Sequence, residues 1–393
     1  MKYYIVSGET SGDLHGSKLM KGLKEADPAA EFRFWGGDLM AAEGGTMVRH
    51  YKETAVMGFW EVLMKLRKVI RNIKQCKQDL LAHRPDVLIL IDYPGFNFRV
   101  AKFAKRHGIK VFYYIAPKVW AWKEKRVHRL RKYVDKLFII FPFEVDYFRK
   151  WGIDAFYAGN PLVDTVDERL ARKPSFSEFI QRNQLHDKSI IAILAGSRMM
   201  EINYVLPRIT PLIQHYPDYQ FVVAGAPAIA LQQYDKYLQG TGIALVTVQT
   251  YELLALADAA IVASGTATLE AALIGVPQVV CYGGNELSYQ IAKRLIKVKY
   301  ASLVNLIMDA PVLTELLQHD MDLANIRDEL SAILPNGPKR QAMLNNYTTL
   351  RTMLGEPDAA TRIAREMINQ LTMNTPVPSQ GGREKVVKVV KDS

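Results

Sequence analysis

The stretch AAIVASGTATLEAALIGVPQVVCY, residues 259–282, is the most informative part of the chain for its fold. An apolar run, 259–263, leads into a turn of small residues, 264–266. A helical pattern follows and ends at Gly275, after which a second apolar run begins. This order predicts a strand, a tight turn, a helix and another buried strand.

The same stretch also predicts a ligand site. Small residues at Ser264, Gly265 and Thr266 let a ligand approach the backbone, and the N-terminus of the new helix attracts anions. Glu270 lies one turn into that helix, where its carboxylate is placed to accept hydrogen bonds from sugar hydroxyls. Together these residues favour a site for a nucleotide sugar.

Composition limits the class of protein. A chain of 393 residues, with 49% hydrophobic and 23% charged residues, fits two globular domains. No apolar run reaches the ~18 residues that span a bilayer, and the N-terminus enters a strand-like run without a signal-peptide pattern. The two cysteines, Cys76 and Cys281, exclude a disulfide framework and fit the reducing cytoplasm.

The formal net charge of +11 suits polyanions, anionic lipid headgroups or phosphorylated substrates. A generic basic surface is the alternative explanation. The sequence shows no zinc-type spacing, Walker A loop or aromatic RNA-binding signature, so nucleic acid is the disfavoured partner and no metal site is predicted.

Strand-like runs alternate with amphipathic helices in both halves of the chain. This alternation predicts two doubly wound α/β domains with parallel sheets, which face each other across a central cleft. The expected strands are 3–7, 32–35, 87–91, 111–115, 136–140, 155–157, 190–194, 220–224, 243–246, 259–262 and 278–281.

The domain boundaries follow from the same pattern. We expect an N-terminal domain at 1–165, a C-terminal nucleotide-binding domain at 186–350 and C-terminal helices at 351–373. The polar, weakly periodic region 161–188 is the candidate hinge. Residues 374–393 combine Pro, Gly and Ser with basic residues and are predicted to be a flexible basic tail.

Several loops that follow strands carry polar residues suited to chemistry. The first loop, with Glu9, Thr10, Ser11 and Asp13, sits between two glycines, although a plain capped turn would look similar. It lacks the G-x-G-x-x-G dinucleotide fingerprint, which argues against NAD.

Asp92 ends a buried strand and is placed to deprotonate an attacking hydroxyl, the alternative being that it caps the turn. Arg198, on a loop of the second half, is placed to hold a diphosphate, although a lone loop arginine is usually just solvated.

Two stretches mix basic and apolar residues. Residues 59–77 form an amphipathic pattern that suits a lipid interface or, alternatively, an ordinary sheet-covering helix with a solvated basic face. Its candidate membrane residues are Phe59, Trp60, Leu63, Leu66, Arg67 and Lys68. In the second stretch, 116–132, Lys118, Trp120 and Trp122 are candidates for contact with a phosphorylated or acylated acceptor, and residues 123–132 for contact with anionic lipid.

Taken together, seven motifs resemble the lipid-A-disaccharide synthase family, and the resemblance runs from about residue 3 to residue 345. The motifs are GETSGD (8–13), AVMGFWEVL (55–63), IDYPGFN (91–97), PKVWAWKEKRV (117–127), AGSR (195–198), ASGTATLE (263–270) and SLVN (302–305).

The resemblance implies a GT-B glycosyltransferase that acts without a bound metal or cofactor. Its expected reaction transfers 2,3-diacylglucosamine from a UDP donor to 2,3-diacylglucosamine 1-phosphate, giving the β-1′,6 lipid A disaccharide 1-phosphate and UDP. The resemblance also implies a peripheral protein on the cytoplasmic face of the bacterial inner membrane. The long C-terminal helices leave room for a homodimer.

By the same resemblance, Asp92 matches the proposed general base and the first-loop residues match a substrate-orienting set. Arg198 matches the arginine at the UDP phosphates, Glu270 the carboxylate at the ribose, and Asn305 an asparagine near the nucleotide. Asn97, in the turn after Asp92, joins the expected substrate-binding residues.

The chain departs from the family pattern at two positions. Gly95 stands where the family often has a second acidic residue, and Ala195 stands where it has proline. The first change leaves Asp92 as the single candidate base in its loop, and the second removes a rigid residue from the loop that carries Arg198.

Three other functions fit parts of the sequence. A nucleotide-sugar 2-epimerase would share the fold but needs no basic amphipathic helix. A transferase of cell-wall precursors would show a glycine-rich first loop in place of GETSGD. A non-catalytic lipid or nucleic-acid binder would explain the charge but not the two anion-binding turns.

Overall fold

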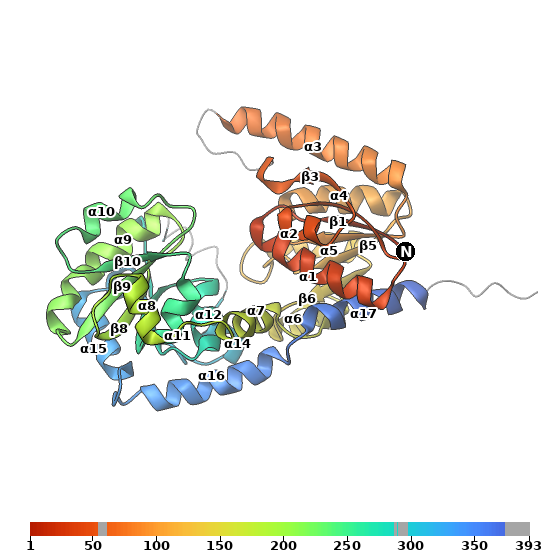
Figure 1. Cartoon of the computed structure of the whole chain (residues 1–393). Coiled ribbons are helices and arrows are strands. Elements are labelled where there is room, and N and C mark those ends of the chain that lie inside the picture. The colour runs from red at the N-terminus through yellow and green to blue at the C-terminus, as the bar shows by residue number, and fades with distance from the viewer. Residues whose placement is uncertain (54–60, 287–288, 290–297, 374–393) are drawn as a thin grey trace, which may run out of the picture.

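The structure, a computed structural model, describes residues 1–53, 61–286, 289 and 298–373. Two α/β lobes lie side by side, and helices cover both faces of the sheet in each (Figure 1). Across these described ranges, no helix combines the length and apolar character needed to cross a bilayer.

The first lobe contains a seven-stranded parallel sheet in the order β3-β2-β1-β4-β5-β6-β7. Along β1, alternate side chains enter different cores: Tyr3 and Ile5 pack on one face and Tyr4 and Val6 on the other. The strands are β1 (Lys2–Val6), β2 (Glu31–Gly36), β3 (Thr46–His50), β4 (Val87–Ile91), β5 (Lys110–Tyr114), β6 (Lys136–Ile139) and β7 (Ala155–Tyr157).

Helices connect these strands as crossovers. The core on the Tyr4 side includes residues of α3 and α4, and the core on the Tyr3 side includes residues of α1. The helices are α1 (Thr10–Ala26), α2 (Asp38–Ala42), α3 (Glu61–His83), α4 (Pro94–Arg106), α5 (Val127–Tyr133) and α6 (Phe143–Lys150).

The second lobe repeats the design with a six-stranded parallel sheet in the order β10-β9-β8-β11-β12-β13. Its strands are β8 (Ser189–Leu194), β9 (Tyr219–Gly225), β10 (Ala244–Thr247), β11 (Ala259–Ala263), β12 (Gln278–Tyr282) and β13 (Glu315–Leu317). Its helices are α9 (Met199–Ile209), α10 (Gln232–Leu238), α11 (Thr250–Leu256), α12 (Thr266–Ile274), α14 (Leu303–Met308), α15 (Leu323–Ile333) and α16 (Arg340–Leu354).

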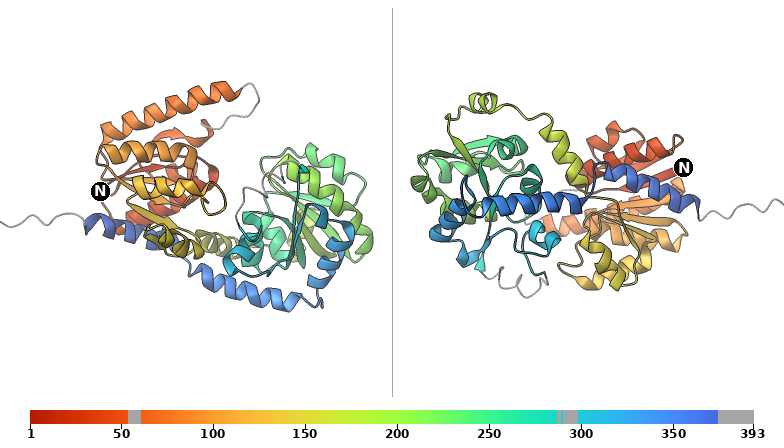
Figure 2. Two further views of the ribbon diagram at one scale, coloured as in Figure 1. Left: turned by 180° about the vertical axis from the view of Figure 1, so that it is seen from behind. Right: turned by 90° about the horizontal axis from the view of Figure 1, so that it is seen from below.

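The chain passes between the lobes twice (Figure 2). Helices α7 (Pro161–Leu170) and α8 (Phe176–Arg182) lead into the second lobe, and α16 leads back to α17 (Ala359–Thr372). Helix α17 packs on α1, where Ile363, Ala364 and Met367 complete the first lobe's core. The last described helix therefore belongs structurally to the first lobe.

The structure confirms the predicted pair of doubly wound parallel sheets, and each expected strand is present. The sequence reading missed β3 and β13. Both are short strands at sheet edges, and β3 is largely exposed, so neither carries a buried apolar run. The candidate hinge, 161–188, contains α7 and α8, while the domain boundaries themselves stay predictions.

We expect Gly22→Ala to lower the stability of the first lobe. A Cβ at Gly22 would lie 2.9 Å from the Cα of Thr361 and 3.1 Å from the Cβ of Ala364, so α17 would have to move. Alanine favours a helix over glycine by up to about 1 kcal/mol, yet overpacking of this kind costs roughly 1–3 kcal/mol. The midpoint of urea unfolding, followed by circular dichroism, measures the net loss.

Gly95→Ala is the matched control, because nothing lies within 4 Å of a Cβ built there. It should leave the unfolding midpoint unchanged or raise it slightly. If Gly22→Ala behaves like this control, the close packing of α1 against α17 is not a constraint on the fold.

Candidate active site

The strand order places four loops where a ligand site is expected. In the first sheet the order reverses between β1 and β4, and in the second it reverses between β8 and β11. Loops that follow neighbouring strands at such a point diverge to opposite faces and leave a crevice at the carboxyl edge. The loops after these four strands are the ones that carry Glu9, Asp92, Arg198 and Gly265.

A strained turn presents Asp92. Asp92 and Tyr93 both have left-handed backbone angles, with φ of 41° and 47°, between β4 and α4. The buried amide of Asn97 donates hydrogen bonds to the carbonyls of Ile91 (3.2 Å) and Asp92 (2.7 Å). The Tyr113 hydroxyl donates a third, of 2.5 Å, to the Asp92 carbonyl. Asn97 thus holds the turn from inside through its backbone carbonyls.

The Asp92 side chain is half-buried and lines a pocket of about 210 Å³. Burial raises the pKa of Asp92, and the nearby Glu9 carboxylate raises it further. The Lys118 ammonium group and the backbone amide of Tyr93 lower it. A carboxyl whose pKa is raised in this way binds a proton more tightly, which suits a general base.

The first loop lies against the same turn. A Cβ on Gly8 would lie 2.4 Å from the Tyr93 ring, so only glycine lets the two loops meet. Glu9 and Ser11 are exposed, and the Thr10 hydroxyl donates to the Tyr51 hydroxyl at 3.3 Å. The exposed groups of this loop are available to a ligand at the crevice.

Asp13 has a different role from its neighbours. It is 2% exposed, and one carboxylate oxygen accepts from the amides of Gly37 (2.7 Å) and Met40 (3.1 Å). The other oxygen accepts from the amide of Leu39 at 3.1 Å. These are the amides at the start of α2, so Asp13 ties α1 to α2 and has little capacity left for a substrate.

Trp120 is also engaged within the protein. Its indole donates to the carboxylate of Glu144 at 2.9 Å, and the other Glu144 oxygen accepts from the amide of Phe141 at 3.1 Å. Burial raises the pKa of Glu144 to about 7. The exposed indole of this loop belongs instead to Trp122, which is 47% exposed. Trp120 therefore anchors the loop, and Lys118 and Trp122 are the exposed members of the three residues predicted to meet the acceptor.

The second lobe contributes a larger pocket of about 590 Å³ at the carboxyl edge of its sheet. Five of the six predicted UDP-binding residues line it: Arg198, Ser264, Gly265, Thr266 and Glu270. Lys118 of the first lobe lines it as well, so the pocket lies between the lobes. The structure therefore brings these five predicted residues together around one cavity.

Arg198 reaches into solvent at the mouth of the pocket. Its side chain is 75% exposed, and one guanidinium nitrogen lies 3.4 Å from the carboxylate of Glu201. The second Glu201 oxygen accepts from the amides of Ser197 (2.8 Å) and Arg198 (3.2 Å). The sequence reading missed Glu201, although its position three residues after Arg198 is that of a capping carboxylate.

Glu201 places a carboxylate at the start of α9, where it accepts from the two amides just before the helix, whereas the start of α12 has no such acidic group. Its N-cap residue, Gly265, has a φ of 151° and provides no side-chain cap. Nothing lies within 4 Å of a Cβ built on Gly265, and both Gly265 and Thr266 are exposed. The Ser264 hydroxyl donates to the Ala301 carbonyl at 2.8 Å, which fixes the turn.

Glu270 lies deeper in the pocket. Its carboxylate accepts a hydrogen bond of 3.0 Å from the Tyr251 hydroxyl, a residue that the sequence reading did not single out. Burial raises the pKa of Glu270, and the Tyr251 hydrogen bond lowers it. The guanidinium of Arg169, from α7, lies 5.9 Å from the centre of the Tyr251 ring. Glu270 is therefore oriented by a residue that also contacts the hinge region.

Asn305 does not line this pocket. It is buried, and its amide nitrogen donates to the Leu313 carbonyl and to the carboxylate of Glu315, both at 2.9 Å. Its amide oxygen accepts from the Leu313 amide at 2.8 Å. Glu315 in turn accepts from the amides of Ala301 and Ser302. Asn305 thus supports the loop that fixes Ser264. Both its amide nitrogen and its amide oxygen already bond within the protein, so the side chain is not free for the expected contact with the nucleotide.

The predicted membrane segment is described only in part. Phe59 and Trp60 lie outside the described residues, as do the side chains of Leu63 and Leu66. Arg67 is exposed and Lys68 is half-buried. Further along α3, Ile73 is buried and Ile70 is 57% exposed. A groove of about 640 Å³ between α3 and α4 is lined by Val69, Ile70, Ile73, Lys74, Lys77, Gln78, Leu81, Arg99 and Phe103.

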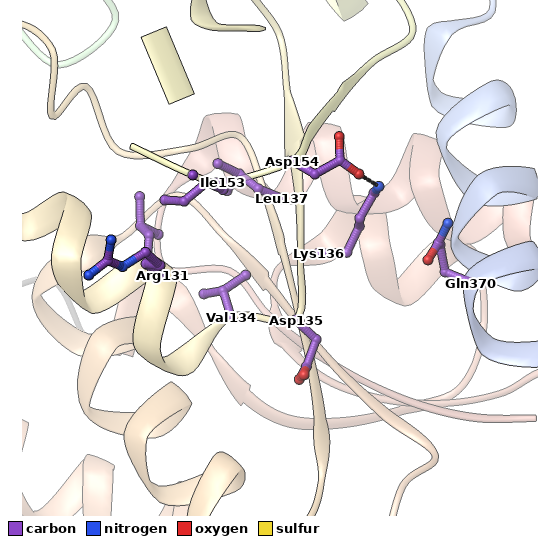
Figure 3. A pocket seen from close by; sticks show the side chains of 10 residues that line it. Arg131, Val134, Asp135, Lys136, Leu137, Ile153, Asp154 and Gln370 are labelled. Atoms are coloured by element: carbon purple, nitrogen blue, oxygen red, sulfur yellow. Dashed lines mark hydrogen bonds and ion pairs between the residues drawn. The ribbon is translucent and has the colours of Figure 1, made fainter. Parts of the chain in front are cut away.

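Another hollow, of about 320 Å³, lies at the amino edge of the first sheet, opposite the carboxyl edge that carries Asp92 (Figure 3). It adjoins the start of β6 and β7, where Lys136 forms an ion pair with Asp154. Gln370 of α17 borders it from the other side. Parallel α/β sheets bind ligands at their carboxyl edges, so this hollow lies away from the expected site.

Comparison with known proteins decides the family. A model described as lipid-A-disaccharide synthetase matches residues 3–367. The chain belongs to this family. The lipid-A-disaccharide synthase of Myxococcus xanthus (strain DK1622) is 36% identical over 374 residues, which is 93% of this chain and 97% of that protein. The Coxiella burnetii (strain Dugway 5J108-111) enzyme of the same name is 35% identical over 369 residues, 93% and 97% of the two chains.

Lipid-A-disaccharide synthetases are glycosyltransferases of lipid A biosynthesis, so the predicted enzyme class is confirmed. The role of the family implies a UDP-sugar donor and a sugar-phosphate acceptor.

Solved structures agree on the fold. An S. aureus MnaA–UDP structure aligns with a TM-score of 0.67 and 14% identity, over 97% of this chain and 100% of that chain. A putative UDP-N-acetylglucosamine 2-epimerase from Listeria monocytogenes aligns with a TM-score of 0.67 and 14% identity, over 95% and 97%. Together with the two facing parallel-sheet lobes, these alignments confirm the predicted GT-B architecture.

Proposed function

We propose that this chain joins UDP-2,3-diacylglucosamine to 2,3-diacylglucosamine 1-phosphate, with inversion, to form the β-1′,6-linked disaccharide 1-phosphate and UDP. One observation carries the proposal. The pocket that holds Asp92 and the pocket that holds Arg198 and Glu270 both include Lys118 in their walls, so they adjoin. A base and a diphosphate site on opposite lobes are what a direct glycosyl transfer requires.

In this reaction the acceptor's 6-hydroxyl attacks the anomeric carbon of the donor. Asp92 takes the hydroxyl proton as the new C–O bond forms, and the bond to UDP breaks with its electron pair leaving on the diphosphate. The raised pKa of Asp92 favours the proton transfer. Glu9 and Ser11, exposed at the same crevice, are placed to orient the sugars.

The second lobe holds the leaving group. Arg198 supplies a guanidinium for charge-assisted hydrogen bonds to the diphosphate, and the uncapped start of α12 adds backbone amides. Both stabilise negative charge as UDP departs. Glu270, held by Tyr251, is placed to accept hydrogen bonds from the ribose hydroxyls.

An epimerase of nucleotide sugars is not favoured. The family match covers residues 3–367, whereas the epimerase structures align at 14% identity, which shows the fold alone. The homodimer stays a prediction.

The membrane location belongs to the proposal as well. We infer that α3 rests on the anionic cytoplasmic surface of the inner membrane. The groove between α3 and α4 supports this, because exposed Ile70 lines it together with a cation of each helix, Lys74 and Arg99. Apolar anchors flanked by cations favour an anionic lipid interface.

Asp92→Asn should reduce kcat by roughly 100- to 10,000-fold, the usual contribution of a general base. The substitution keeps the shape of the side chain but removes its basic oxygen. The affinity for UDP should remain within about twofold of the wild type, since Asp92 lies on the other lobe. Steady-state kinetics and isothermal titration calorimetry give the two values. Near-normal turnover would remove Asp92 from the role of base.

Arg198→Ala should produce the complementary pattern and weaken UDP binding by roughly tenfold to a hundredfold, the value of a charge-assisted hydrogen bond. The same calorimetry measures this loss, and kcat should fall too because the leaving group loses a cation. The control is Arg208→Ala on the same helix, which should leave the affinity for UDP unchanged. The Arg208 guanidinium packs on the Tyr204 ring, 3.7 Å from its centre. Equal UDP affinity for the wild type and Arg198→Ala would contradict the assigned role.

Ile70→Asp should weaken binding to vesicles that contain anionic phospholipid by roughly tenfold, because a charge replaces an apolar anchor. Co-sedimentation with vesicles measures the bound fraction. Leu231→Asp is the matched control, since Leu231 is 50% exposed on the second lobe. If both variants bind vesicles as the wild type does, α3 is not the membrane-facing element.

A further inference from the structure

Lys118 occupies the junction of the two pockets described above. It is exposed, and it lines both the pocket of Asp92 and the pocket of Arg198 and Glu270. It comes from the first lobe, on the loop that follows β5 (Lys110–Tyr114), whereas the rest of the second pocket comes from the second lobe. Its ammonium group therefore approaches the donor pocket from the acceptor side.

The backbone around Lys118 is fixed. Its carbonyl accepts from the amide of Ala121 at 3.2 Å, and the next residue, Val119, is buried. Trp120 is tied to Glu144 by its 2.9 Å hydrogen bond. A fixed backbone with an exposed, flexible side chain is the usual arrangement for a residue that binds a ligand.

Within the described part of the chain, no carboxylate or carbonyl oxygen forms a hydrogen bond or ion pair with the ammonium group of Lys118. Its positive charge still acts on the carboxyl of Asp92, whose pKa it lowers.

The other charged groups around Asp92 are few. Glu9, on the loop after β1, raises the pKa of Asp92, and Arg126, on the 3-10 turn Glu124–Arg126, lines the same pocket. Burial raises the pKa as well. Of these groups, Lys118 is the one that also borders the donor pocket.

We propose that Lys118 binds a phosphate of the nucleotide diphosphate across the cleft from Arg198, and that this contact withdraws its charge from Asp92. The proposal rests on the proposed function, because it needs the second-lobe pocket to hold a diphosphate. It differs from the sequence-based expectation, in which Lys118 meets the acceptor.

The contact would have two consequences. Two cations on opposite lobes would clamp the diphosphate and stabilise its charge as it leaves. At the same time the phosphate charge would neutralise the ammonium field at Asp92, so the pKa of Asp92, already raised by burial and by Glu9, would rise further when the donor is bound. The base would then be strongest in the complex in which it acts.

The first experiment is calorimetric titration of the full chain with UDP alone, without acceptor. Lys118→Met should weaken UDP binding by roughly tenfold, whereas Lys118→Arg should retain most of the affinity because it keeps the charge. Lys125→Met is the matched control, since Lys125 is an exposed lysine of the same basic stretch that lines neither pocket. Thermal melting confirms that each variant is folded.

The acceptor also carries a phosphate, and the same experiments separate the two sources. If Lys118→Met leaves UDP affinity within twofold of the wild type but raises KM for the sugar phosphate, Lys118 serves the acceptor and the proposal is overturned.

The pH profile tests the link to Asp92. The acid limb of kcat/KM for the UDP-sugar donor reports the pKa of the base in the enzyme before the donor binds. In Lys118→Met this limb should move to higher pH, because the lysine that lowers the pKa of Asp92 is gone. A residue with a merely structural role would change the height of the profile but not the position of its limb. An unmoved limb would overturn the coupling.

The failure of this inference and the failure of the proposed function give different results. If the wild type does not bind UDP, or Arg198→Ala binds it normally, the donor site itself is wrong. If the wild type binds UDP and Arg198→Ala weakens it, but Lys118→Met does not, only the assignment of Lys118 fails.

Discussion

Parallel pairing of the strands is the constraint on which the proposed site depends. In a parallel sheet the carboxyl ends of all strands meet at one edge, and right-handed crossovers place helices on both faces. A crevice forms where the strand order reverses, which is beside β1 and β4 in one lobe and beside β8 and β11 in the other. The candidate base and the candidate diphosphate site each follow one of these strands. The strand topology therefore places the candidate base and the candidate diphosphate site on different lobes.

Holding the reactive groups at these edges requires polar groups that bond to the backbone of the loops. The left-handed angles of Asp92 and Tyr93 each cost free energy, and the buried hydrogen bonds of Asn97 and Tyr113 offset that cost. Glu144 likewise holds the loop of Lys118, because its carboxylate accepts the hydrogen bond of the Trp120 indole. In this site, buried polar side chains hold the loops and exposed ones are left for substrate, which explains why residue type alone did not separate the two roles.

The sequence was sufficient for the regular elements, because buried strands carry continuous apolar runs and the loops after them carry small or charged residues. It was not sufficient for the partners of each side chain. Asp13 accepts hydrogen bonds from amides 24 to 27 residues away. The partners of Asn305 are Glu315, in β13, and Leu313, just before that strand. Glu201 and Tyr251 were missed for the same reason: a capping carboxylate and a half-buried tyrosine look ordinary until the fold brings them beside Arg198 and Glu270.

The donor pocket also adjoins the connection between the lobes. Val163 and Val166 of α7 belong to the second lobe's core, while Glu168 of the same helix pairs with Lys18 of α1 at 2.9 Å. Arg169, one residue on, lies over the ring of Tyr251, whose hydroxyl holds Glu270. The ion pair of Lys18 with Glu168 contributes little free energy, but α7 also packs with Phe141 of the first lobe, and its Asp164 accepts a hydrogen bond from the amide of Asp358, just ahead of α17. Through Arg169 and Tyr251, Glu270 is therefore connected to a helix that packs against both lobes.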